Sequence, residues 1–172
     1  MARYKIAPEQ SHVWIDARSN VHPIHASTDG LEGHIELQLS NGGGVDTIAQ
    51  ANGKLSLRVD RISSGNRLED RELQRRINAR RFPTIDGVLC GIERSEEADR
   101  YRISGDVTFR GVSCRHEDWM SITSVDEQTL HLGGTSRFDI RAFGMEPPRM
   151  LLLKVEPEVD VRVEIVAVRE EH

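Results

Sequence analysis

The sequence predicts an all-β protein, an antiparallel β-barrel or sandwich of about eight strands that carries one short α-helix. Three observations predict this class. Apolar and polar residues alternate with a period of two along most of the chain, short polar turns separate the alternating segments, and a single segment has the pattern of a helix. The length of 172 residues and the hydrophobic content of 37% suit one core. We therefore expect a single domain over residues 1–172.

Three segments alternate most clearly and are predicted to be strands with one buried and one wet face: residues 54–60, 101–110 and 158–165. Weaker alternation predicts further strands at residues 13–17, 35–39, 88–92, 120–122, 130–132 and 138–140. Glycine-rich or polar turns are expected between them, among others at residues 41–44, 52–53 and 133–134.

One segment departs from this alternation and predicts a helix over about residues 67–78. Asn66, followed three residues later by Glu69, resembles an N-terminal capping box, and the Pro at position 83 requires the helix to end by Arg81. Leu73 and Ile77 are four residues apart and give the helix one narrow apolar stripe. We expect this helix to lie across an open end of the sheet structure.

Composition excludes several classes of protein. The net charge of −5 disfavours general nucleic-acid binding, and no apolar run approaches the roughly 20 residues of a membrane-spanning segment. Residues 1–8 lack the apolar core of a secretory signal, so we expect a cytoplasmic protein. Cys90 and Cys114 are expected to be reduced and mostly buried.

Motifs of catalysis are missing from the sequence. It contains no GxSxG elbow, no phosphate-binding P-loop, no GxGxxG turn and no HExxH metal motif. We therefore expect a protein that is not an enzyme and needs no cofactor.

Several segments, in order along the chain, resemble the YceI-like family. Residues 4–13 are similar to the first strand of that family, and residues 62–66, with Asp70 and Leu73 after them, to its junction between strand and helix. Residues 82–85 resemble its aromatic-Pro-Thr-Ile strand start, residues 105–113 its most diagnostic strand and turn, and Phe143-Gly144 its corner near the C-terminus. Ala7, Gln10 and the residues around Arg141 depart from the family pattern.

The resemblance implies an extended lipocalin-like antiparallel barrel. It also implies non-enzymatic binding, storage or transport of an amphiphile, a polyisoprenoid or fatty-acid-like lipid, whose apolar chain is enclosed in the barrel. Many members of the family carry a secretion signal.

The barrel interior of such a protein is either filled by its own side chains or wide enough for a small ligand. Its candidate lining consists of inward-facing apolar residues, and the same residues would form a filled core: Val13, Ile15, Leu57, Val59, Ile103, Val107, Phe109, Phe138, Val161 and Val163. Both interpretations stay open at this point. A filled barrel would act as a protein-interaction module, and the apolar corner at residues 143–153 is a candidate homodimer surface.

Arginines cluster at the end of the predicted helix, where a barrel mouth would be covered. Arg75, Arg80 and Arg81 are candidates for binding the anionic head of an amphiphile, because guanidinium groups bind phosphate and carboxylate in a bidentate manner. The alternative is a solvated face in which these arginines pair with neighbouring acidic residues of the helix.

The segment Val21-His22-Pro23-Ile24-His25 is the most unusual local feature. Two histidines three residues apart can share a metal ion if the chain turns between them, which makes a metal-binding protein the alternative function. No acidic residue or cysteine completes a ligand pattern, so we assign no metal site. His22 and His25 are also candidates for binding the head of a ligand at the barrel mouth.

Overall fold

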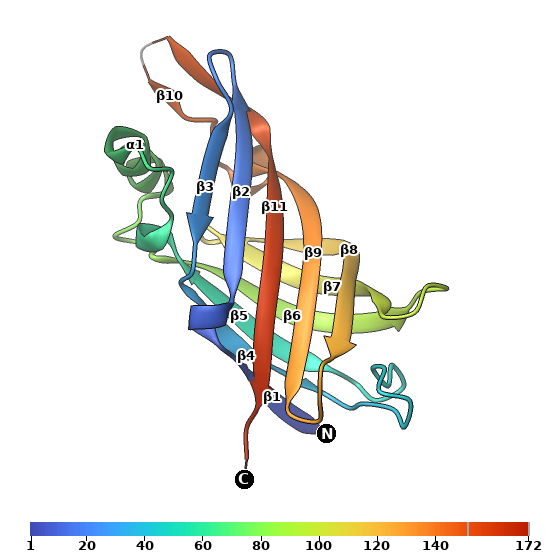
Figure 1. Ribbon diagram of the computed structural model, residues 1–172. Coiled ribbons are helices and arrows are strands. Elements are labelled where there is room, and N and C mark those ends of the chain that lie inside the picture. Colours follow the sequence, from blue (N-terminus) through green and yellow to red (C-terminus); the bar gives the residue numbers. More distant parts are fainter. Residues whose placement is uncertain (151, 172) are drawn as a thin grey trace.

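The structure is a computed structural model that describes residues 1–150 and 152–171, and its main feature is a closed antiparallel barrel of eight strands (Figure 1). The barrel closes because β1 pairs with both β4 and β11. Its strands are β1 (Ala2–Ile6), β4 (Leu31–Leu37), β5 (Asn52–Arg58), β6 (Thr84–Arg94), β7 (Arg100–Phe109), β8 (Val112–Ser124), β9 (Thr129–Asp139) and β11 (Leu153–Arg169). The all-β, lipocalin-like class predicted from the sequence is confirmed.

Two further strands extend the wall on one side. β2 (His12–Ser19) pairs with the first half of β11, beyond the point at which β1 pairs with the second half, and β3 (Ile24–Thr28) pairs with β2. A short strand, β10 (Arg149–Met150), folds back on the start of β11. Figure 1 shows β3, β2, β11 and β9 running together along the front of the barrel, with both chain termini at the end opposite the helix.

The alternation in sequence predicts most of these strands correctly, because each inward-facing residue is followed by an outward-facing one. It misses the ends of some strands. Val59 belongs to a short 3-10 helix, η2 (Val59–Arg61), that follows β5, and Ile140 begins another, η3 (Ile140–Phe143), after β9. β3 was not predicted as a strand, and His25 lies in it instead of in a loop.

The turn predicted at residues 133–134 is wrong. Both glycines lie inside β9, which is a single strand where the sequence predicts two. A Cβ atom on Gly134 would lie 3.1 Å from the carbonyl oxygen of Trp119 in β8, so a glycine permits the close approach of the two strands. The turn predicted at residues 52–53 is also wrong, because these residues begin β5.

Helix α1 (Arg67–Ile77) is the one α-helix of the described chain, close to its predicted bounds. The side-chain oxygen of Asn66 accepts hydrogen bonds from the backbone N–H groups of Leu68 and Glu69, as expected of an N-cap. The helix ends four residues before Arg81, because Asn78 adopts the left-handed conformation and its N–H bonds back to the last turn.

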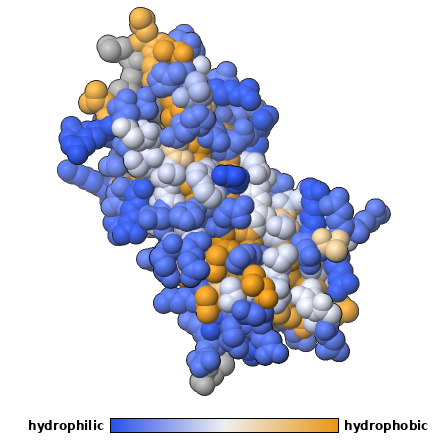
Figure 2. Space-filling model, viewed as in Figure 1, coloured by the Kyte–Doolittle hydropathy of each residue, from blue (hydrophilic) through white to orange (hydrophobic). Residues whose placement is uncertain are grey.

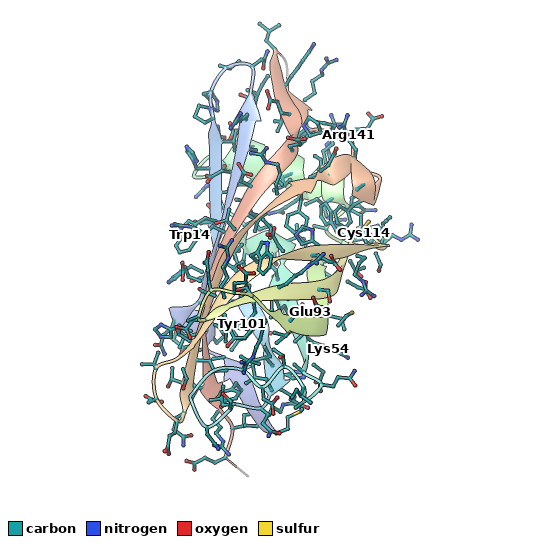
Figure 3. The ribbon with its side chains drawn as sticks, turned by 90° about the vertical axis from the view of Figure 1, so that its right-hand side faces the viewer. Trp14, Lys54, Glu93, Tyr101, Cys114 and Arg141 are labelled. Atoms are coloured by element: carbon teal, nitrogen blue, oxygen red, sulfur yellow. The ribbon has the colours of Figure 1, made fainter. Side chains whose placement is uncertain are left out.

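β8 bends from one side of the barrel to the other. Its residues 112–121 pair with β7, and Ser121–Ser124 pair with β9. Ser121 takes part in both pairings and marks the bend. On the far side of this bend β8 and β9 diverge: Figure 3 shows Cys114 on the outlying part of β8 and Arg141 above it, where β9 has led into η3. Residues 112–120 of β8 and residues 134–139 of β9 are not paired with each other, and we call this part of the wall the seam.

The surface is mainly hydrophilic, and one of its apolar areas lies at the end that carries the helix. Figure 2 shows hydrophobic atoms gathered there, over β10 and the loop between β2 and β3. Leu152 is 85% exposed and Val21 64%. The candidate homodimer surface at residues 143–153 overlaps this area, although its Leu151 lies outside the described residues.

The two cysteines and the helices can be compared with what the sequence predicts of thiol burial and of membrane spans. Cys90 and Cys114 are free thiols, as expected, but both are partly exposed instead of mostly buried. Over residues 1–150 and 152–171, no helix combines the length and the apolar character needed to cross a bilayer.

Candidate functional site

The barrel is hollow. A cavity of about 330 Å³ lies under α1, and we call it the helix-end chamber. A second cavity of about 190 Å³ lies nearer the chain termini, where Ile6 and Ala167 contribute to its wall, and we call it the termini-end chamber. Many inward-facing apolar side chains, such as Ile15, Val107 and Val161, are only partly buried because they border these spaces. The interior is therefore not filled by the protein's own side chains.

Eight of the ten apolar residues named as candidate lining border the helix-end chamber: Val13, Ile15, Leu57, Val107, Phe109, Phe138, Val161 and Val163. Ile103 borders the termini-end chamber instead. Val59 borders neither chamber. It is fully buried in a small cluster with Ile77, Phe109, Phe143 and Met145.

Much of the helix-end chamber comes from segments that the sequence analysis did not assign to it. β3 supplies Ile24 and Ala26, and the segment after β9 supplies Ile140, Phe143 and Met145. Leu73 and Ile77 of α1 border the chamber too, which confirms that the apolar stripe of the helix covers an open end of the barrel. The four-residue spacing of Leu73 and Ile77 indicated in the sequence that the helix has an apolar side. No local pattern indicates that the residues of β3 and of the segment after β9 border a cavity.

The rim of the helix-end chamber is acidic. Glu69, Asp70, Glu72 and Asp86 border it, and each has a partner. Asp70 accepts hydrogen bonds from the N–H and hydroxyl of Ser64, and Asp86 accepts one from the Thr84 hydroxyl. The first two bonds hold Asp70 against the segment that leads into the helix, and the third lies within β6.

Glu72 is the most strongly held of these carboxylates. It accepts hydrogen bonds from the guanidinium groups of Arg75 (2.7 Å) and Arg76 (2.8 Å). These bonds, that of Arg75 first, lower the pKa of Glu72 from 4.5 to about 2 against the opposing effect of desolvation.

The candidate head-binding arginines lie outside both chambers. Arg75 is exposed and held by Glu72, which is the pairing that the solvated-face interpretation expects. Arg80 and Arg81 are exposed, and the guanidinium carbon of Arg81 lies 5.1 Å from the centre of the Phe82 ring. The structure does not bring these three side chains to either chamber.

The structure also separates His22 from His25. His25 faces outward and its Nδ1 contacts the carboxylate of Asp16, whereas the Nε2 of His22 lies 3.7 Å from Glu69 at the rim of the helix-end chamber. In the part of the chain that the structure describes, no three His, Cys, Asp or Glu side chains form a group that could hold a metal ion.

The two chambers adjoin, and we call the boundary between them the waist. Leu55, Gly87 and Val107 border both of them. The rings of His116 and Phe138 stack here with their centroids 4.3 Å apart, and Phe138 borders the helix-end chamber while His116 borders the termini-end chamber. His116 was not singled out from the sequence, where it stands among alternating polar residues.

The family of YceI-like domains matches residues 4–167. No curated protein matches the sequence.

Solved structures with the same fold cover nearly the whole chain. BcnA of Burkholderia cenocepacia has a TM-score of 0.76 at 13% identity, over 94% of this chain and 98% of its own. A polyisoprenoid binding domain from Saccharophagus degradans, implicated in plant cell wall breakdown, has a TM-score of 0.76 at 9% identity, over 99% and 100%. A YCEI protein of Campylobacter jejuni has a TM-score of 0.67 at 12% identity, over 85% of each chain.

Proposed function

This chain belongs to the YceI-like family, and we propose that it binds the apolar chain of an amphiphilic ligand inside its barrel. The observation that carries this proposal is the hollow interior, because an apolar space of about 330 Å³ inside a small barrel has no role in holding the fold together. The ligand class is that of polyisoprenoids or fatty-acid-like lipids, which the polyisoprenoid binding domain from Saccharophagus degradans supports.

Burial of the ligand chain would supply the affinity. Each methylene moved from water into an apolar chamber contributes about 0.8 kcal/mol, so ten of them contribute about 8 kcal/mol before the entropy cost of association. The two chambers meet at the waist, and a flexible chain suits such a divided space better than a rigid ring system does. Binding of this kind needs neither catalysis nor a cofactor.

The biological role we propose is storage or transport of this ligand. The cytoplasmic location and the homodimer stay predictions. A metal-binding function gains no support from the arrangement of His22 and His25, and a barrel filled by its own side chains is not what the cavities indicate.

Native mass spectrometry of gently purified protein tests the proposal, followed by organic extraction and lipid analysis of the released compound. We expect one isoprenoid or acyl molecule per chain, retained by the native protein and lost on denaturation. A ligand-free mass that stays unchanged when such lipids are added would contradict the proposal.

A pair of variants tests whether the ligand lies in the barrel. Ala26→Phe places a large side chain in the helix-end chamber, and we expect it to lower lipid occupancy at least tenfold. His25→Phe adds a ring at the neighbouring position of β3, on the outer face, and is the matched control that should bind normally. Equal binding by both variants would place the ligand elsewhere.

A further inference from the structure

Two polar side chains, His116 and Asp118, form a pair on the inner face of the barrel beside the seam. His116 and Asp118 stand on β8, across from Gly105 and Ile103 of β7, and both border the termini-end chamber. Ser136 of β9 borders the same chamber from the other side of the seam. The other inward positions of these strands nearby, such as Met120 and Leu132, are apolar.

The imidazole of His116 is held in place by packing, and one of its ring nitrogens makes no hydrogen bond. Its ring stacks on Phe138, and its side chain is 28% exposed as a whole. Its Nε2 is nevertheless buried, and it has no hydrogen-bond partner among the described residues. The nearest acceptor, Oδ2 of Asp118, is 3.6 Å away, which is beyond hydrogen-bond length.

The carboxylate of Asp118 has a hydrogen-bond partner at only one of its two oxygens. Its Oδ1 accepts a hydrogen bond of 2.8 Å from the backbone N–H of Trp119, which leaves Oδ2 directed toward His116. The side chain is 35% exposed. A buried nitrogen without a partner destabilises a fold, so a Phe at position 116 would keep the stacking at lower cost. Nε2 of His116 and Oδ2 of Asp118 are therefore available to hydrogen-bond a ligand.

We propose that His116 and Asp118 bind the uncharged hydroxyl head of the ligand, so that the ligand is a long-chain alcohol. The hydroxyl oxygen accepts a hydrogen bond from Nε2–H of His116, and the hydroxyl donates one to Oδ2 of Asp118. A phosphate or carboxylate head would place its negative charge beside the Asp118 carboxylate, which disfavours it. Lys54 also borders this chamber, but it is exposed to solvent, so its charge is screened. This inference rests on the proposed function and specifies the chemical class of the ligand.

The orientation of the ligand follows from the position of the pair. With the hydroxyl in the termini-end chamber, the chain passes the waist at Leu55 and Val107 and fills the larger helix-end chamber under α1. The head is then far from the arginines of the helix, which agrees with the pairing of Arg75 to Glu72.

A competition between three ligands with the same tail tests the inference. Farnesol, farnesyl phosphate and farnesene are mixed in equal amounts with the delipidated wild-type protein, and the bound species are counted by native mass spectrometry. We expect farnesol to exceed each of the other two about tenfold, as two hydrogen bonds gained and a charge repulsion avoided would produce.

Two variants and one control localise this preference. His116→Phe and Asp118→Leu, which each remove a hydrogen-bonding group and keep a side chain of similar size, should reduce the preference for farnesol over farnesene to below threefold, with farnesene binding unchanged. Glu117→Gln changes the residue between them, which faces outward and pairs with Arg102, and it should keep the wild-type preference. Thermal unfolding checks that the variants are folded, and His116→Phe should be at least as stable as the wild type.

The results separate the two proposals. Equal binding of the three ligands by the wild type, or a preference that survives both variants, would overturn the inference and leave the proposed function intact. Preferential binding of farnesyl phosphate would overturn it as well. Failure of all three ligands to bind would contradict the proposed function and the inference together.

Discussion

Gly33 in β4 is a single residue on which the barrel wall depends. Its φ is +143°, and a Cβ atom at this position would lie 2.0 Å from the backbone oxygen of Lys54 in β5. Since β4 and β5 are hydrogen-bonded neighbours in the wall, neither strand can move away without loss of pairing.

Substitution Gly33→Ala is therefore expected to lower the free energy of unfolding by about 3 kcal/mol or more. Chemical denaturation at pH 7 measures the change. Gly42→Ala is the matched control, since a Cβ there meets nothing within 4 Å, and it should change stability by less than about 0.5 kcal/mol. A Gly33→Ala protein as stable as the control would show that the two strands approach less closely than described.

Glu72 makes stability depend on pH. Its pKa is lowered to about 2 in the folded protein, mainly by Arg75 and then Arg76, against 4.5 ordinarily. The ionised Glu72 therefore contributes fully to the free energy of unfolding above about pH 4.5, and this contribution is lost as the pH falls toward 2. Glu72→Gln should lower stability at pH 7 by less than about 1 kcal/mol, since the arginine partners are solvated.

The measurement is urea denaturation of wild type and Glu72→Gln at pH values between 7 and 3. We expect the difference in stability to shrink as the pH drops below 4.5. A difference that stays constant over this range would mean that the carboxylate is not held by Arg75 and Arg76.

At the scale of elements, the start of α1 depends on one side chain. Asn66 satisfies two backbone N–H groups of the first turn, and the helix then places Leu73 and Ile77 over the helix-end chamber. Asn66→Ala should cost about 1 kcal/mol of stability, whereas Asn66→Asp keeps an acceptor oxygen and should cost little. Thermal denaturation of the two variants tests this, and equal loss in both would show that the cap is not the cause.

The strands show how far local pattern determines an element. Alternation predicts the inward residues of β7 and the second half of β11, because a strand with one wet face must place its apolar side chains on the other. It cannot predict that residues 129–139 form one strand, since the glycines at 133 and 134 resemble a turn. Their role depends on Trp119 of β8 and Glu164 of β11, which are remote in sequence.

At the scale of the whole molecule, the closed ladder couples every strand to its neighbours around the barrel. We expect residues 1–172 to unfold as one domain, with coincident thermal transitions by circular dichroism and by tryptophan fluorescence. Ligand at one hundred times its dissociation constant should stabilise the protein by about 2.7 kcal/mol and raise the midpoint by several degrees. Two separate transitions would contradict the single domain.

The sequence by itself determined the all-β class, the position of the helix, the resemblance to the YceI-like family and eight of the apolar residues that border the helix-end chamber. These features follow from the spacing of apolar residues and from short motifs, both of which can be read directly from the sequence. Only the tertiary structure decided that the interior is hollow, because a filled core and an apolar chamber use the same residues and differ in how far apart the walls stand. It also decided that Arg75 and His25 face away from the two chambers and that His116 and Asp118 border the termini-end chamber. The side of a wall that a polar residue occupies depends on the pairing of distant strands.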